Sequence, residues 1–150
     1  MQHDILIIGS GFGGQCAAIN LLKRGITDFK ILERRDFMGG TWCQNSYPGA
    51  AVDVQSPLYS ISFEPYKWSQ MFVEQAELEE YTNFVIDKYK LRERTVTNCN
   101  VEQVRWDEAA RQWVLATSQG ELRARVVINA SGPLSTPVIP NFPGLSLIHI

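Results

Sequence analysis

The chain has 150 residues, 45% hydrophobic and 20% charged, which is the composition of a globular domain large enough to bury a core. Its net charge of −2 excludes the long-range attraction to nucleic acid or to an anionic membrane surface that a strongly basic protein would have. Because no signal peptide or apolar run of membrane-spanning length is visible, we expect a cytoplasmic protein with no membrane and no nucleic acid among its partners.

The first third of the sequence predicts a strand, a helix and a second strand. Residues 4–8 are an apolar run of the kind found in buried parallel strands. Residues 13–24 have a helical pattern, and Gly25 follows as a plausible C-terminal cap. Residues 28–33 then form a second apolar run that ends at Glu33. Together they match the size of a βαβ unit.

The next segment is irregular and is followed by a helix. Residues 36–57 are rich in Gly, Pro, Asn and Ser, and such a long stretch without periodicity is more often a functional loop than a connector. Residues 74–90 are amphipathic, with Leu78, Tyr81, Val85 and Tyr89 on one face and Phe84 beside them.

The pattern changes to β after Thr95. Two alternating runs are followed by residues 121–132, whose apolar centre is typical of a return to a buried parallel sheet. Residues 135–144 contain three prolines and resemble a linker. The predicted fold class is therefore α/β: a Rossmann-like domain in which a parallel sheet with helices carries an antiparallel β-meander insertion.

The first glycine-rich string has a dinucleotide-binding pattern. Gly9, Gly11 and Gly14 form G-x-G-x-x-G between the predicted strand and helix, where they permit a tight turn, close approach of a pyrophosphate, and close helix–strand packing. Glu33, 19 residues after Gly14, could accept hydrogen bonds from the hydroxyls of an adenosine ribose. A carboxylate there argues against a 2′-phosphate, so FAD or NAD is favoured. Arg34 and Arg35 are interpreted as solvated surface charge.

A second string makes the interpretation more specific. Residues 39–42 read GGTW, and NSYPG, Asp53 and Tyr59-Ser60 follow in order. This arrangement resembles the FAD-binding domain of flavin-dependent monooxygenases of the Baeyer–Villiger and related flavin-containing types. The resemblance extends over about residues 4–144. The GGTW and YPG strings with Asp53 favour the Baeyer–Villiger type.

The resemblance implies a set of site residues. Gly11 and Phe12 would touch the flavin pyrophosphate, and Glu33 the adenosine ribose. Asp53, near the flavin ring and the nicotinamide, is the one candidate catalytic residue. The full set of candidate cofactor-binding residues is Gly9, Gly11, Phe12, Gly14, Glu33, Gly40, Thr41, Trp42, Asp53, Tyr59, Val101 and Gly132.

The resemblance also implies a reaction that needs more than this chain. Such enzymes use FAD and NADPH to transfer one oxygen atom from O2 to a small-molecule ketone or to a nitrogen or sulfur centre. No second G-x-G-x-x-G is present, so we expect the NADPH site to lie mostly outside this chain. We expect residues 1–144 to be an incomplete FAD-binding domain that is inactive alone. Residues 145–150, which match one translation of a DNA-library adapter, are expected to be a non-native tail.

Three other classes of protein share parts of this pattern. Flavin disulfide reductases need two cysteines that form and break a disulfide, but Cys16, Cys43 and Cys99 contain no C-x-x-x-x-C pair. A simple NAD-dependent dehydrogenase is disfavoured by the β-meander. A non-catalytic FAD-binding module stays open, as does the oligomeric state.

Overall fold

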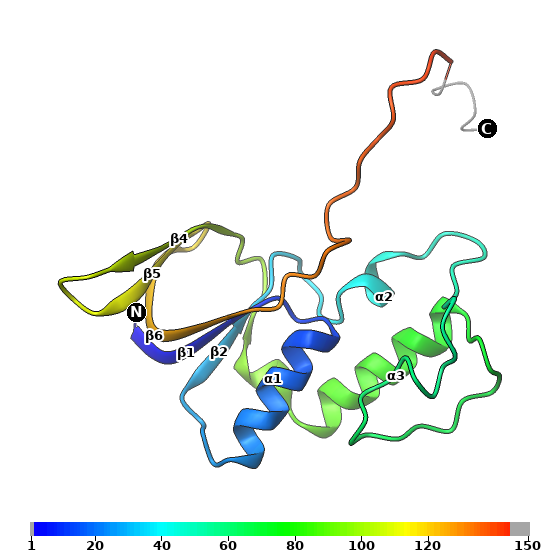
Figure 1. Ribbon diagram of the computed structural model, residues 1–150, viewed down its shortest axis with the longest axis horizontal. Coiled ribbons are helices and arrows are strands. Elements are labelled where there is room, and N and C mark those ends of the chain that lie inside the picture. The colour runs from blue at the N-terminus through cyan, green and yellow to red at the C-terminus, as the bar shows by residue number, and fades with distance from the viewer. Residues whose placement is uncertain (1, 145–150) are drawn as a thin grey trace.

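The computed structural model describes residues 2–144, which form one mixed six-stranded sheet with helices packed against it (Figure 1). The strand order is β3-β2-β1-β6-β5-β4, with β1 in the interior of the sheet. Strands β1, β2, β3 and β6 run parallel, and β4, β5 and β6 form an antiparallel meander. The predicted α/β, Rossmann-like class is confirmed. The elements are β1 (Gln2–Ile8), α1 (Phe12–Lys23), β2 (Phe29–Leu32), α2 (Thr41–Gln44), α3 (Gln75–Lys88), a 3₁₀ turn η1 (Leu91–Arg94), β3 (Thr95–Val96), β4 (Val101–Asp107), β5 (Gln112–Thr117) and β6 (Gly120–Asn129).

Strand β6 joins the two halves of the sheet. Its first half pairs antiparallel with β5, from Gly120 to Ala124, while residues 123–129 pair in parallel with β1. The meander is therefore continuous with the parallel sheet. Because β6 ends beside β1, the segment after Asn129 lies next to the loop that follows β1. There the N–H of Ala130 donates to the carbonyl of Ile8 at 2.8 Å.

Helices α1 and α3 cover one face of the parallel strands (Figure 1). The predicted helix at 74–90 is observed as Gln75–Lys88. Of its predicted face, Leu78, Tyr81 and Val85 are buried, whereas Tyr89 is half-buried and follows the helix as its C-terminal cap, and Phe84 is 42% exposed. The core on this face contains Ile5, Ile7, Ala18, Ile19, Phe29, Ile31, Tyr81, Val85 and Ile86. On the opposite face, the bent meander covers a smaller cluster that includes Leu6, Leu32, Leu115 and Ala124. None of the described helices is long and apolar enough to cross a membrane.

Two short elements escaped the sequence patterns. Helix α2 lies inside the predicted loop, and η1 follows α3. Each has only four residues, which is too short to show a helical periodicity. The predicted tail at 145–150 lies outside the described residues.

A hydroxyl on α3 holds the loop after the second glycine-rich string. The Tyr81 hydroxyl accepts the N–H of Ile61 at 2.9 Å and donates to the carbonyl of Glu64 at 3.0 Å. The buried Glu64 carboxylate in turn accepts the Tyr89 hydroxyl at 2.7 Å and pairs with Lys88. These contacts fix residues 61–64 on α3 and so place the nearby Tyr59.

Removing this hydroxyl should destabilise the domain. In the Tyr81→Phe variant the ring still fills the core, but a buried N–H and a buried carbonyl lose their partner. We expect the free energy of unfolding to fall by about 1–3 kcal/mol, measured by urea denaturation. Tyr47→Phe, which changes a ring that is 64% exposed, is the control and should unfold like the parent chain. Equal stability of Tyr81→Phe and the parent would contradict the role of this hydroxyl.

Candidate dinucleotide-binding site

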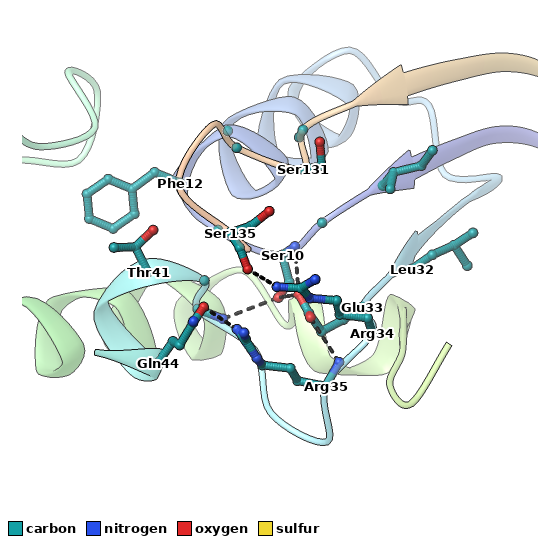
Figure 2. Close-up of a pocket in the computed structure, with 18 of the residues that line it drawn as sticks. Ser10, Phe12, Leu32, Glu33, Arg34, Arg35, Thr41, Gln44, Ser131 and Ser135 are labelled. Atoms are coloured by element: carbon teal, nitrogen blue, oxygen red, sulfur yellow. Dashed lines mark hydrogen bonds between the residues drawn. The ribbon is translucent and has the colours of Figure 1, made fainter. Parts of the chain in front are cut away.

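A pocket of about 600 Å³ opens at the carboxyl ends of β1, β2 and β6 (Figure 2). This volume is within the range of small-molecule and cofactor sites, and the carboxyl edge of parallel strands is where open α/β sheets bind ligands. Its walls come from segments far apart in the sequence: the loop after β1, the end of β2, α2, Tyr59, the residues before β4, and the segment after β6.

The first glycine-rich string forms the turn from β1 into α1. Gly9 has φ +98°, and a Cβ there would lie 2.5 Å from the carbonyl oxygen of Ala130. A Cβ on Gly14 would lie 2.0 Å from the carbonyl oxygen of Gly9. Helix α1 starts at Phe12 with no acidic residue in its first turn and no side-chain cap. Its first backbone N–H groups, at the positive end of the helix dipole, are therefore suited to a phosphate.

The second string packs directly on the first. Gly40, with φ +67°, is so close that a Cβ there would lie 2.7 Å from the Cα of Gly11. Gly40 is also the N-terminal cap of α2, which begins at Thr41. The two strings thus form one continuous backbone wall, with no side chain between them at the point of contact.

Glu33 lies beside this wall and is buried, with 7% of the residue exposed. Its Oε2 accepts the N–H of Ser10 at 3.1 Å and the hydroxyl of Ser10 at 2.5 Å. Its Oε1 accepts the N–H of Arg35 at 3.0 Å (Figure 2). Three protein donors therefore fix the orientation of the carboxylate at the pocket wall.

Three aromatic side chains lie at the other end of the pocket. The rings of Phe12 and Tyr59 have centroids 5.8 Å apart, and Trp42 meets Tyr59 edge-on at 5.8 Å. The indole N–H of Trp42 also lies 3.2 Å from the Tyr59 hydroxyl oxygen, to which it donates. This geometry makes a rigid, largely apolar rim that can exclude water from one end of a ligand.

Most of the predicted cofactor-binding residues meet in this pocket. Gly14 does not line it but packs beneath the turn, as its predicted role in helix–strand packing requires. Asp53 is exposed and is not among the pocket-lining residues, so its catalytic role stays a prediction. The predicted residues that line the pocket are Gly9, Gly11, Phe12, Glu33, Gly40, Thr41, Trp42, Tyr59, Val101 and Gly132.

The pocket also contains residues that the sequence analysis did not assign to a binding site. Arg34 and Arg35, interpreted as surface charge, both line it: Arg34 donates to the carbonyl of Ser135 and Arg35 to the side-chain oxygen of Gln44. Ser10 was also missed. The only available signal was position, since all three residues lie within two residues of the end of a predicted parallel strand, at the ligand-binding edge.

The donors and the shape of the pocket fit a dinucleotide. A helix N-terminus faces it without a competing acid, a buried carboxylate stands where a ribose hydroxyl could be bound, and an aromatic rim closes the far end. Among the described residues, no group of three or more His, Cys, Asp or Glu side chains could hold a metal ion.

The three cysteines are free thiols and do not form a redox pair. Cys43 lies in α2, and its burial, with a smaller contribution from the Glu79 carboxylate, raises the pKa of its thiol from 9.0 to about 11. Since the thiolate is the reactive form, this thiol is poorly suited to disulfide exchange at neutral pH.

Cys43 should therefore resist alkylation while the chain is folded. At pH 8 a shift of this size lowers the thiolate fraction about a hundredfold, so iodoacetamide should modify Cys43 far more slowly in the folded than in the urea-unfolded chain. The sign follows from the raised pKa: the rate in the folded chain should keep increasing up to about pH 11. Peptide mass spectrometry gives the rates, and equal rates in both states would contradict the prediction.

Known proteins share both the sequence and this geometry. Residues 6–150 match the family described as "Pyridine nucleotide-disulphide oxidoreductase". The chain is 46% identical over 142 residues to a Baeyer–Villiger monooxygenase of Streptomyces coelicolor, and 43% identical over 143 residues to one of Pseudomonas aeruginosa. In each case the match covers 94% of this chain and 27% of the relative.

Solved structures agree. Cyclohexanone monooxygenase from Rhodococcus sp. Phi1, bound to NADP+, superimposes with a TM-score of 0.89 at 34% identity, over 97% of this chain and 29% of that one. An oxidised steroid monooxygenase bound to NADP gives a TM-score of 0.88 at 32% identity, with the same coverage of 97% and 29%.

This chain therefore belongs to the pyridine nucleotide–disulphide oxidoreductase family. Within it, the resemblance to the flavin-binding part of Baeyer–Villiger-type monooxygenases is confirmed. The chain spans between a quarter and a third of the length of these relatives.

Proposed function

We propose that this chain binds FAD and that the protein it represents is an FAD- and NADPH-dependent monooxygenase. The observation that carries the proposal is the pocket itself. Both glycine-rich strings, the buried Glu33 carboxylate and the Phe12–Trp42–Tyr59 rim converge on one cavity, although they come from separate parts of the sequence. The similarity to Baeyer–Villiger monooxygenases over 94% of the chain supports the same conclusion.

Each part of the pocket has a role in this proposal. The N-terminus of α1 and the facing backbone of Gly11 and Gly40 bind the pyrophosphate, where free N–H groups and the helix dipole favour negative charge. Glu33 binds the adenosine ribose. The aromatic rim positions and shields the flavin end. FAD, when bound, supplies the redox chemistry with NADPH and O2, and the protein contributes binding, orientation and exclusion of water.

The substrate and the second cofactor are proposed more broadly. The substrate is a small molecule, either a ketone that receives an oxygen atom or a nitrogen or sulfur centre that is oxidised. NADPH binds in the remainder of the protein, and Asp53 is proposed to act near the nicotinamide. A cytoplasmic location and a catalytically silent flavin-binding role both stay predictions from the sequence.

Flavin binding can be tested on the 150-residue chain directly. After incubation with FAD and desalting, we expect visible flavin absorbance that stays with the protein, while circular dichroism confirms that the chain is folded. The same sample should not oxidise NADPH. A folded chain that retains no flavin would overturn the proposal, and rapid NADPH-dependent oxygen consumption by the 150-residue chain would overturn the assignment of the NADPH site to the rest of the protein.

A further inference from the structure

Ser10 lies between the first two glycines of the G-x-G-x-x-G string and is fully buried. Its N–H, its hydroxyl and its carbonyl all make hydrogen bonds. Its N–H and hydroxyl both donate to Oε2 of Glu33, at 3.1 and 2.5 Å. Its hydroxyl oxygen accepts the N–H of Gly39 at 3.2 Å, and its carbonyl accepts the side-chain amide of Gln15 at 3.1 Å.

One hydroxyl therefore connects three parts of the pocket: the turn after β1, the carboxylate at the end of β2, and the start of the second glycine-rich string (Figure 2). These partners are 23 and 29 residues away in the sequence. A carboxylate offers about four acceptor positions. Ser10 occupies two on Oε2 and Arg35 one on Oε1, so the position left for a ligand is on Oε1.

We propose that Ser10 is a positioning residue for the adenosine ribose of the cofactor. Its hydroxyl accepts the N–H of Gly39, which fixes the hydroxyl so that it donates to Glu33, and Glu33 is thereby held with its free acceptor position facing the pocket. This inference rests on the proposed FAD binding. Its specific content is that Ser10 acts through Glu33 on the adenosine half of the ligand and has no direct effect on the flavin half.

A double-mutant cycle tests this coupling. The FAD dissociation constants of the parent chain, Ser10→Ala, Glu33→Gln and the double variant are measured by flavin fluorescence. We expect Ser10→Ala to weaken FAD binding about tenfold in the parent, because a hydrogen bond to a charged group is lost. In the Glu33→Gln background the same change should weaken binding by less than about twofold. A tenfold loss in both backgrounds would show that Ser10 does not act through Glu33.

Ser56 supplies a matched control. It is also fully buried, its hydroxyl donates to the carbonyl of Met71 at 2.9 Å and accepts the N–H of Val73 at 3.1 Å, and it does not line the pocket. Ser56→Ala should lower the melting temperature without changing FAD affinity once the chain is folded. If Ser56→Ala weakens FAD binding as much as Ser10→Ala does, the effect of Ser10 is one of general stability and the inference fails.

Two ligands and one flavin-free readout complete the test. ADP, which has the same ribose, should lose affinity in Ser10→Ala as FAD does, while FMN, which lacks it, should not. Without any ligand, hydrogen exchange at the Gly39 amide should be faster in Ser10→Ala than in the parent. If the parent chain binds neither FAD nor ADP, the proposed function fails and this inference with it. If both bind but ADP affinity is unchanged in Ser10→Ala, the inference alone is overturned.

Discussion

The Gly14→Ala variant is expected to lose about 3 kcal/mol of its free energy of unfolding. The added Cβ would lie 2.0 Å from the carbonyl oxygen of Gly9 and 3.0 Å from its carbonyl carbon, and both of these atoms belong to the backbone. No side-chain rotation can relieve such a contact, so helix α1 or the turn after β1 must shift. Overpacking of this kind usually costs about 1–3 kcal/mol, and rigid backbone on both sides places it at the upper end.

The neighbouring residue provides the control. A Cβ on Gly13 would meet only the Cβ of Ala130, at 3.5 Å, which is an ordinary van der Waals contact. Gly13→Ala also improves helix propensity, so its stability should equal or slightly exceed that of the parent, within about 1 kcal/mol. Urea denaturation of the two variants measures the difference. A Gly14→Ala chain as stable as Gly13→Ala would show that helix α1 can move away from β1 at little cost.

The Gly40→Ala variant is expected to bind FAD at least about tenfold more weakly, which corresponds to about 1.4 kcal/mol. Its Cβ would lie 2.7 Å from the Cα of Gly11, so the two glycine-rich strings must separate where the proposed pyrophosphate site lies. The positive φ of +67° adds strain of about 1–2 kcal/mol for any residue with a side chain.

A substitution at Gly49 separates the effect of backbone strain from the effect of the close contact between the two strings. It also has a positive φ, +81°, but a Cβ there would have no atom within 4 Å, and it lies outside the pocket lining. Gly49→Ala should therefore show the strain as a loss of stability while FAD affinity is kept. Fluorescence titration gives the FAD affinities of both variants, and melting temperatures measured in parallel give their stabilities. Equal FAD affinities would mean that the contact between the strings does not shape the binding site.

The parts of this site that the sequence predicted are those with local signals. Gly9, Gly11 and Gly14 can be identified by spacing because each satisfies a requirement of the same turn. Glu33 follows from the length of one helix and one strand, so its distance from the turn is also nearly fixed. The fold class could be predicted for the same reason, because a buried strand, an amphipathic helix and an alternating strand each have a recognisable local pattern of apolar residues.

The parts that were missed depend on contacts between distant segments. The role of Ser10 exists only because Glu33 and Gly39 meet it in space, and nothing about a serine between two glycines indicates this. Arg34 carries the same charge on a free surface as beside a pocket, and only the position of Ser135 distinguishes the two. Asp53 shows the opposite case, because its motif is clear while the residue is exposed and does not line the pocket.

The shared strand β6 has a consequence for the order in which the site is assembled. Its pairing with β1, from Gln2 with Arg123 to Ile8 with Asn129, closes a loop of roughly 120 residues. The glycine-rich turns, which are local, can form early, but the wall made by Asn129 to Ser135 is added only when this long-range pairing is complete. During synthesis the pocket therefore stays open on one side until residue 135 has left the ribosome.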